Sequence, residues 1–559
     1  MVGGIHMKRK AKKILAVFMA ALMILPLALP ASAAWGLSGS KDVPIIHIYG
    51  DGESIHDADG NKLLKYKDLL GNINGDGDGE EDESRKEEIY KSVANVVMPF
   101  LIQGLGTGDY QPYYDALQKE IGELFGDLLL DNNGEASNGS QMNPECAAIM
   151  AKKRHEDTAK GKGYYGLNDY VFWYDWRLDP LTVADSLHEY IEDIKAATNK
   201  KEVAIVGRCL GSSVATAYVA KYGMDGIRGI GFDGGVVNGA EVLSETISGK
   251  FRFDGNAINR FLMDCNALGM FKVDEFINET IDMLAKAGVF DTIAGVTKEV
   301  IYYQVVEGVT SALALSTFFT FPSYWAAVKS DDYEEAKRYV FGEEGSAKRE
   351  EYAGLIAKLD NYDKVVRQQI PNIMNEINDN GNLAVIAKYG VQIAPVIASN
   401  NAVADQFASV ACASYGATTS DIYSTLSDEY IAQRVAEGKG KYISPDRQID
   451  ASTCQFPDQT WFLKGAKHSH WTDVENRILY NVITADHQLT VDDCEYSQFV
   501  VYDVKTSGAT AMTEENCDTY YWKADKNADN PPSSASRLFS FLLSLLNWLL
   551  SLINKISHK

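Results

Sequence analysis

The sequence predicts an α/β protein, with a mainly parallel sheet that has helices on both faces and a large, mostly helical insertion. Over residues 43–232, short apolar strands alternate with segments of helical periodicity, which is typical of βαβ units. From about 238 to 385 the pattern is mostly helical, and strand character returns at 391–397 and 460–463. We interpret the helical stretch as a cap, or lid, inserted into the sheet domain.

Each element before the cap follows from its local pattern. The first strand is expected at residues 43–49, an apolar run that ends in a tight Gly-Asp-Gly turn. Two later apolar runs, 203–206 and 227–232, are bounded by glycines and have the length of buried strands. In chain order, the other elements expected here are helices at 87–101 and 113–130, a strand at 170–174, and helices at 184–197 and 213–221.

The composition is that of a folded, acidic protein. Its 77 Asp and Glu residues against 53 Lys and Arg give a net charge of -24, which repels phosphates, so no nucleic acid is expected as a partner. With 46% hydrophobic and 11% aromatic residues, disorder as the main state is excluded. Seven cysteines in 559 residues are too few for a disulfide scaffold, and an odd number leaves at least one unpaired.

Residues 1–33 have the pattern of a secretory signal peptide. Five basic residues between positions 8 and 13 precede an apolar run, 14–29, and a small-x-small cleavage site, Ala-Ser-Ala at 31–33. An uncleaved membrane anchor is the alternative, but the apolar run is short and contains a proline. We therefore expect an exported protein that is extracellular or peripherally attached to the cell surface.

The C-terminal segment, 537–559, follows a low-complexity linker at 527–536. Its polar residues recur at intervals of 4, 3, 4 and 3 among Leu, Phe, Ile and Trp, which gives one narrow polar stripe along a helix. We expect an amphipathic helix that lies on a membrane surface. Self-association, docking on the cap and a true membrane span are the alternatives. The sheet domain then has two parts, 34–237 and 386–526, on either side of the cap.

The segment 207–211, Gly-Arg-Cys-Leu-Gly, has the form of a nucleophile elbow, because it lies directly after a strand and before a helix. Its glycines permit a sharp turn that lifts the central side chain above the sheet. The following helix points N–H groups at that side chain, which favours a thiolate and a developing oxyanion. Cys209 is therefore the candidate nucleophile. The Leu210 N–H and a donor from Asp51, in the turn after the first strand, are the candidate oxyanion hole.

A cysteine nucleophile needs a base and an orienting acid, which we expect in the chain order nucleophile, acid, histidine. His468 follows the last predicted strand and is the preferred base, with His470 as the alternative. Asp446 is the preferred acid, with Asp450 as an alternative and Asp233, directly after a strand, as another. Each residue alone has an ordinary interpretation as a surface histidine or a loop-capping aspartate, but together they preserve the expected order.

Four short segments are similar to segments of one known family: Pro-Ile-Ile-His-Ile-Tyr-Gly at 44–50, Tyr-Asp-Trp-Arg at 174–177, the elbow, and Phe-Pro-Ser-Tyr-Trp at 321–325. They resemble the lecithin–cholesterol acyltransferase-like lipases and acyltransferases, and the run from 43 to about 470 resembles an α/β-hydrolase. The resemblance implies the α/β-hydrolase fold. It also implies acyl transfer from an ester through an acyl-enzyme, with water or an alcohol as the acceptor.

Carried over by position, the family's nucleophile, acid and base would be Cys209, Asp446 and His468. Asp51 and Leu210 would form its oxyanion hole. The cysteine departs from this family, which has serine at that position, although dienelactone-hydrolase-like enzymes are a branch of the fold that uses cysteine. A cysteine acyl-enzyme is a reactive thioester, which suits transfer to an amine or alcohol and the cleavage of thioesters or activated esters.

We therefore expect an exported enzyme that hydrolyses or transfers acyl esters through an acyl-cysteine intermediate. Two features favour an apolar, lipid-like substrate: the predicted membrane helix and a group of cap aromatics, which can also be ordinary cap core. These aromatics are Phe318, Phe319, Phe321, Tyr324 and Trp325. The alternatives are a non-catalytic lipid- or peptide-binding protein on a hydrolase fold, and a cysteine-dependent thioesterase or amidase.

Residues 72–83 approximate a calcium-binding loop. Asn72, Asn74 and Asp76 would provide oxygen ligands at alternate positions. A glycine follows for the turn, and Glu83 is the final carboxylate. A solvated acidic loop is the alternative interpretation, and it is the one we favour. No Cys/His cluster has zinc spacing, so no cofactor other than this calcium ion is expected.

Overall fold

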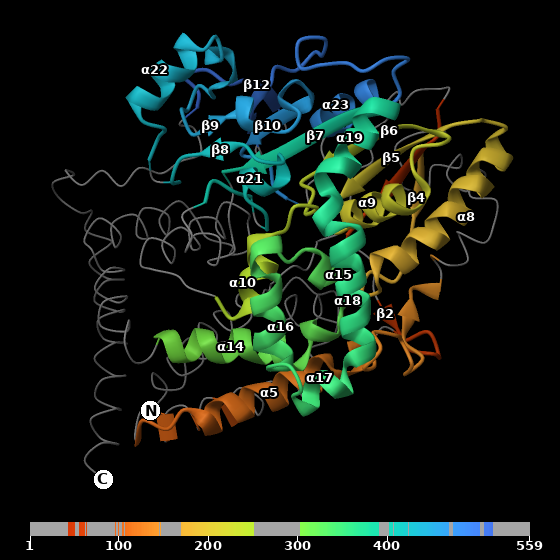
Figure 1. Ribbon diagram of the computed structural model, residues 1–559, viewed down its shortest axis with the longest axis vertical. Coiled ribbons are helices and arrows are strands. Elements are labelled where there is room, and N and C mark those ends of the chain that lie inside the picture. The colour runs from red at the N-terminus through yellow and green to blue at the C-terminus, as the bar shows by residue number, and fades with distance from the viewer. Residues whose placement is uncertain are drawn as a thin grey trace, which may run out of the picture.

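Among the residues that the structure describes, eight strands form one central sheet, and all but one neighbouring pair are parallel (Figure 1). In their order across the sheet of this computed structural model, the strands are β12 (Gly508–Ala511), β11 (Phe499–Asp503), β10 (Thr460–Lys464), β7 (Asn382–Tyr389), β6 (Ile227–Asp233), β5 (Val203–Arg208), β1 (Ile45–Ile48) and β4 (Asp169–Phe172). Only β12 is antiparallel to its neighbour. The structure describes residues 43–50, 55–61, 63, 95–96, 99, 103–104, 107–144, 146, 169–250, 302–390, 402–405, 407–422, 424–468, 473–503 and 508–517.

The strand order reverses at β1. The chain passes from β1 to β4 on one side and then returns to β5 on the other, so that Ile48 pairs with both Phe172 and Gly207. In parallel sheets, ligands and catalytic groups gather beyond the carboxyl ends of the strands at such a point. The turn that begins after β1 and the segment 207–211, which begins in the last residues of β5, both lie here.

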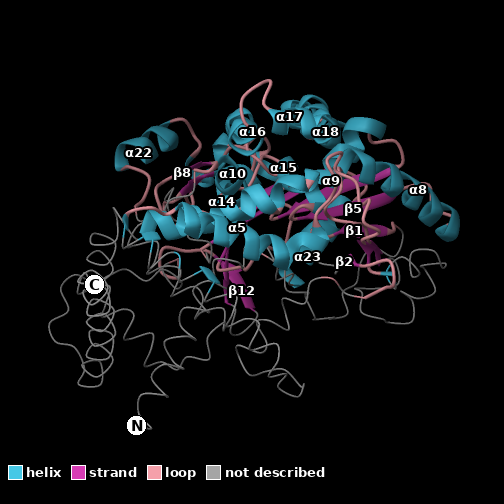
Figure 2. Ribbon diagram, turned by 90° about the horizontal axis from the view of Figure 1, so that it is seen from below, coloured by secondary structure: helices cyan, strands magenta, loops and turns pink. Residues whose placement is uncertain are grey.

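Helices cover both faces of the sheet, as the sequence predicts. Alternate strand residues face opposite sides. On β5, Ile205 packs in an apolar cluster with α8 (Pro180–Thr198), α9 (Gly211–Tyr222) and α19 (Ile370–Asn380). Val206, the next residue, packs in a second cluster with α23 (Asp473–Ile483). In Figure 2, β5 and β1 lie between α9 and α23.

Most predicted elements are found, with shifted ends. Helix α8 begins before the predicted residue 184 because Asp179 caps it, accepting a hydrogen bond from the Leu181 N–H, and Pro180 occupies its first turn. The helix predicted at 113–130 is α5 (Gln111–Phe125), which continues as a single turn of 3-10 helix over Gly126–Leu128. The smaller elements are β2 (Ile55–His56), β3 (Gln141–Met142), β8 (Thr418–Thr419), β9 (Ile449–Asp450), α21 (Val410–Ala413) and α22 (Asp428–Ala436).

The chain between β6 and β7 is helical in its described parts. In Figure 1 its helices lie below the central strands, except α19, which lies beside β7. They are α10 (Glu241–Ser248), α14 (Tyr302–Ser316), α15 (Pro322–Ala326), α16 (Tyr333–Phe341), α17 (Ala347–Glu351), α18 (Ala353–Val365) and α19. The aromatic residues expected in the cap are buried here, and Tyr324 stacks on Trp176 with ring centroids 5.6 Å apart. They form packed core, which is the ordinary interpretation of this group.

Sheet structure resumes at Asn382, before the predicted boundary at residue 385. The strand expected at 391–397 lies outside the described residues, as do the signal peptide, the linker and the amphipathic tail, which stay predictions. In the part of the chain that is described, no helix has the length and apolar character to cross a membrane.

Candidate active site

The Cys209 thiol lies at a sharp turn between β5 and α9. Cys209 has φ = +51°, a left-handed backbone conformation that is uncommon for residues other than glycine and that often marks functional sites. The predicted elbow is therefore present, but its unusual backbone angle is at the cysteine. The residue is 7% exposed, and Cys209, Cys412, Cys454 and Cys494 are free thiols.

The two glycines of the elbow are required by close packing. A Cβ atom at Gly207 would lie 2.9 Å from the Cα atom of Ser212, and one at Gly211 would collide with the carbonyl oxygen of Ile48. The start of α9 therefore presses directly against the end of β1. This contact holds the thiol at the carboxyl edge of the sheet.

Ser212 stabilises the turn at Cys209 through two hydrogen bonds of its hydroxyl group. Its hydroxyl group donates a hydrogen bond to the carbonyl oxygen of Cys209 and accepts one, at 3.0 Å, from the Val236 N–H. The serine is fully buried, so both bonds are shielded from water. It links the strained turn after β5 to the turn after β6.

His468 lies in the loop after β10 and is 1% exposed. Its Nδ1 atom lies 2.6 Å from the Oδ2 atom of Asp405, a residue that the sequence analysis did not propose. The other carboxylate oxygen of Asp405 accepts hydrogen bonds from the N–H groups of Phe407 and Ala408, both at 2.8 Å. Asp405 is thus aimed at His468 by its own turn, which is the geometry of an orienting acid.

The imidazole of His468 also interacts with the side chain of Cys209. Burial alone would lower the pKa of His468, but the Asp405 carboxylate and the Cys209 thiolate outweigh burial and raise it to about 10. The raised pKa keeps the imidazole protonated next to the Asp405 carboxylate.

We expect that removing the thiolate will lower the pKa of His468 from about 10, because one of the two charges that raise it is lost. Because folding raises this pKa, the protonated ring contributes to the free energy of unfolding. That contribution is complete below about pH 6.5, the ordinary pKa of histidine, and is lost as the pH rises toward about 10. Side-chain ¹⁵N NMR titration of the Cys209→Ala and Cys209→Ser proteins measures the shift. Both should titrate lower than the parent, because neither side chain carries a charge, and an unchanged pKa would exclude the ion pair.

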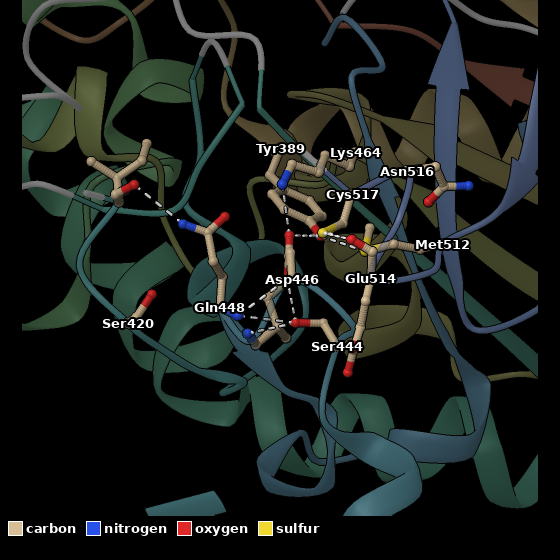
Figure 3. Close-up of polar contacts among 12 residues, drawn as sticks. Tyr389, Ser420, Ser444, Asp446, Gln448, Lys464, Met512, Glu514, Asn516 and Cys517 are labelled. Atoms are coloured by element: carbon tan, nitrogen blue, oxygen red, sulfur yellow. Dashed lines mark hydrogen bonds and ion pairs between the residues drawn. The ribbon is translucent and has the colours of Figure 1, made fainter. Parts of the chain in front are cut away.

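The preferred acid from the sequence, Asp446, is wrong as the partner of His468. Its carboxylate accepts hydrogen bonds from the Tyr389 hydroxyl at 2.8 Å, the Lys464 ammonium at 2.9 Å and the Ser444 hydroxyl at 2.5 Å (Figure 3). Lys464 and Tyr389 end the strands β10 and β7, so this buried ion pair joins two strand ends.

The alternative acids are also engaged elsewhere. Asp450 pairs with Arg434 at 2.7 Å and accepts a hydrogen bond from Tyr430. Asp233 pairs with Lys388 at 3.0 Å and with Arg208 at 3.4 Å. Both aspartates are buried and engaged in ion pairs. The alternative base, His470, lies outside the described residues.

Lys388 connects the two halves of the site. Besides Asp233, its ammonium group contacts Glu475 at 3.1 Å and donates to the backbone carbonyl of His468 at 3.4 Å. Burial would lower the pKa of Lys388, but the two carboxylates outweigh burial and raise it. The lysine therefore stays charged and holds the loop that carries His468 close to the elbow.

Arg208, next to the nucleophile, belongs to the same buried network. It donates to Nδ1 of His47 at 2.7 Å and to the amide oxygen of Asn476 at 2.5 Å. Burial and the adjacent guanidinium group lower the pKa of His47 well below its ordinary value, so this histidine is neutral. Burial raises the pKa of Asp169, at the far end of the network, to about 6.

Gly50, in the turn after β1, packs closely against Cys209 and Leu210. A Cβ atom built on Gly50 would lie 3.2 Å from the Cys209 Sγ atom and 3.2 Å from the Leu210 nitrogen. That point is within bonding reach of both a nucleophile and an N–H donor, which is where a reacting carbonyl group must sit. The role of Leu210 as an oxyanion donor stays a prediction, and Asp51 lies outside the described residues.

The sequence does contain one signal for Asp405. It is the first carboxylate after β7, and it follows the apolar run Ala402-Val403-Ala404. A strand correctly placed at 382–389 would have made it the natural candidate for an acid that precedes the histidine in the chain.

No group of three or more His, Cys, Asp or Glu side chains in the described ranges is arranged to hold a metal ion. The calcium-loop candidate, Asn72, Asn74, Asp76 and Glu83, lies outside those ranges.

Comparison with known proteins gives no assignment. No family model matches the chain, and no curated protein has significant sequence similarity to it.

Proposed function

We propose that this chain is an α/β-hydrolase-fold enzyme that hydrolyses or transfers acyl groups through an acyl-cysteine intermediate. Cys209 is the nucleophile, His468 the base and Asp405 the orienting acid. The observation that carries the proposal is their convergence: His468 is held by Asp405 at 2.6 Å and is electrostatically coupled to Cys209, although the three residues lie far apart in the chain.

The arrangement of the chain supports the hydrolase fold. A mostly parallel sheet, a sharp strand–turn–helix at the nucleophile, and the order Cys209, Asp405, His468 are features of that fold. In this proposal the helical segment between β6 and β7 is the cap. The tail at 537–559 is its membrane-surface helix.

The chemistry needs only groups of this chain and an acceptor. The Cys209 thiolate attacks the ester carbonyl carbon, and the resulting oxyanion is held by the Leu210 N–H together with a donor proposed from Asp51. When the intermediate collapses, the C–O bond breaks and His468 gives its proton to the leaving alcohol. The neutral ring then takes a proton from water or an acceptor alcohol, which attacks the thioester and releases the thiolate.

An apolar acyl chain is the substrate that we favour. Cys209 and Leu210 belong to the large apolar core cluster that also contains Val236, Phe321 and Tyr324, which favours an apolar acyl group over a charged one. The same chemistry accepts thioesters and, when the leaving amine is protonated, amides. Matched thioester and anilide substrates therefore test the thioesterase and amidase alternatives.

The test is intact-mass spectrometry after brief incubation with p-nitrophenyl esters of short and long chains. We expect a mass increase of one acyl group that peptide mapping locates at Cys209 and that is absent from the Cys209→Ala protein. The other cysteines serve as internal controls, because they carry no predicted base. If no adduct and no nitrophenol release occur with any chain length, the protein is instead a non-catalytic binder of lipid or peptide.

A further inference from the structure

Asp405 lies at the tip of a tightly closed loop, which we call the acid loop and define as residues 402–405 and 407–413. Ala404 and Ser409 form an antiparallel bridge, and the Asp405 N–H donates to the Ala408 carbonyl oxygen at 3.0 Å. The loop makes two contacts with His468. One is the Asp405 carboxylate, and the other is the Phe407 ring, which lies edge-on with ring centroids 4.5 Å apart.

A buried carboxylate from another element grips this loop. Glu241 is the first residue of α10, in the segment after β6, and it is 5% exposed. One of its oxygens accepts a hydrogen bond from the Ser409 N–H at 2.7 Å, and the other accepts one from the Cys412 thiol at 3.3 Å. Both donors belong to the acid loop, so the two oxygens hold it at two points.

The charges around Glu241 favour its hydrogen bonds to the acid loop. Burial and the charge of Glu241 raise the pKa of Cys412 well above its ordinary value, so this thiol keeps its proton and remains a donor. Burial would lower the pKa of Lys329, but Glu241 and neighbouring acidic groups outweigh burial and raise it. A charged lysine therefore balances the buried carboxylate.

We propose that Glu241 is a positioning residue for the catalytic acid, which it serves by fixing the acid loop against His468. The inference rests on the proposed function of Cys209, His468 and Asp405. Glu241 touches none of these three residues in its described bonds and acts only through Ser409 and Cys412. A loop released from α10 would withdraw both the Asp405 carboxylate and the Phe407 ring from the imidazole.

Two substitutions at Glu241 separate the effect of side-chain length from the effect of charge. Glu241→Gln keeps the length of the side chain and an oxygen for the Ser409 N–H but removes the charge. Glu241→Asp keeps the charge and suits the first turn of a helix, but it withdraws the carboxylate by one C–C bond, about 1.5 Å. Glu245→Gln, at a buried glutamate one turn further along α10, is the matched control.

We expect Glu241→Asp to lower kcat about 10- to 100-fold with little change in KM, because misplaced supporting groups cost about that much. Glu241→Gln and Glu245→Gln should stay within a few-fold of the parent. The spectroscopic readout is the downfield proton resonance of the His468 Nδ1–H, which Glu241→Asp should broaden or shift upfield while the other two variants keep it. Equal effects of Asp and Gln, a larger effect of Gln, or no effect of either would overturn the proposal.

The two readouts also distinguish the inference from its premise. If the parent protein turns over no ester but Glu241→Asp still weakens the Nδ1–H resonance, the positioning role stands and the proposed function fails. If catalysis is confirmed but the resonance and kcat are unchanged in Glu241→Asp, the positioning role alone is wrong.

Discussion

Replacing Asp405 with asparagine is expected to lower the rate of acyl transfer by on the order of 10²–10⁴-fold. The amide oxygen can keep accepting the N–H groups of Phe407 and Ala408, so the loop should retain its shape. The amide NH₂ would then face Nδ1 of His468, which could no longer donate to it. The ring is left in the wrong tautomer, with a proton on Nε2, where the thiol proton must go. Pre-steady-state release of nitrophenol measures the acylation rate directly.

The matched change Asp446→Asn should lower the stability of the protein and leave the acylation rate nearly unchanged. Asp446 and Lys464 form an ion pair whose side chains are 2% and 1% exposed, and breaking a buried pair costs about 3–5 kcal/mol because one charge is left alone. We therefore expect a large loss of unfolding free energy in urea, with the acylation rate of the remaining folded protein within a few-fold of the parent. If Asp446→Asn abolished acylation and Asp405→Asn did not, the assignment of the acid to Asp405 would be wrong.

Placing a methyl group at Gly50 is expected to lower kcat/KM by about 10²–10³-fold, the loss typical of a blocked oxyanion donor. The new Cβ atom would stand 3.2 Å from both the Cys209 Sγ atom and the Leu210 nitrogen, in the position assigned to the reacting carbonyl. Steady-state turnover of a p-nitrophenyl ester measures the effect, and alkylation of Cys209 by iodoacetamide reports whether the thiol itself is intact.

Gly122 provides the control for this substitution. It lies within α5, and a Cβ atom there would meet nothing within 4 Å, so Gly122→Ala should leave turnover unchanged. Normal turnover in Gly50→Ala would mean that the carbonyl group does not bind in front of Gly50. The oxyanion hole proposed for Leu210 would then have to be abandoned.

The sequence predicted the elements whose signal is local. The elbow was recognised because a buried strand, two glycines and a helix follow one another within a few residues, and the strands β5 and β6 were found within a residue or two of their ends. His468 was found because it follows the apolar strand β10 directly. In each case the residues that determine the structure are neighbours in the chain.

The acid could not be identified in this way. Asp405 is defined by its distance to a residue 63 positions later in the chain, and Asp446 sits in an equally plausible loop. The strand before Asp405 was also not predicted, because β7 contains Asn382 and the charged Lys388, which interrupt its apolar pattern. Lys388 is buried only because Asp233 and Glu475 neutralise it, and these partners lie on other elements.

The order of strands in the sheet also bears on how the protein folds. From β5 onward, the order across the sheet follows the order along the chain: β5, β6, β7, β10, β11, β12. A chain that folds from its N-terminus can therefore extend the sheet one strand at a time. The turn that carries Cys209 is held by β1, β5, α9 and the turn after β6, whereas His468 is positioned only after β10 has paired with β7. Under the proposed function, the thiol is thus in place well before its base, and reactivity begins only when most of the chain has folded.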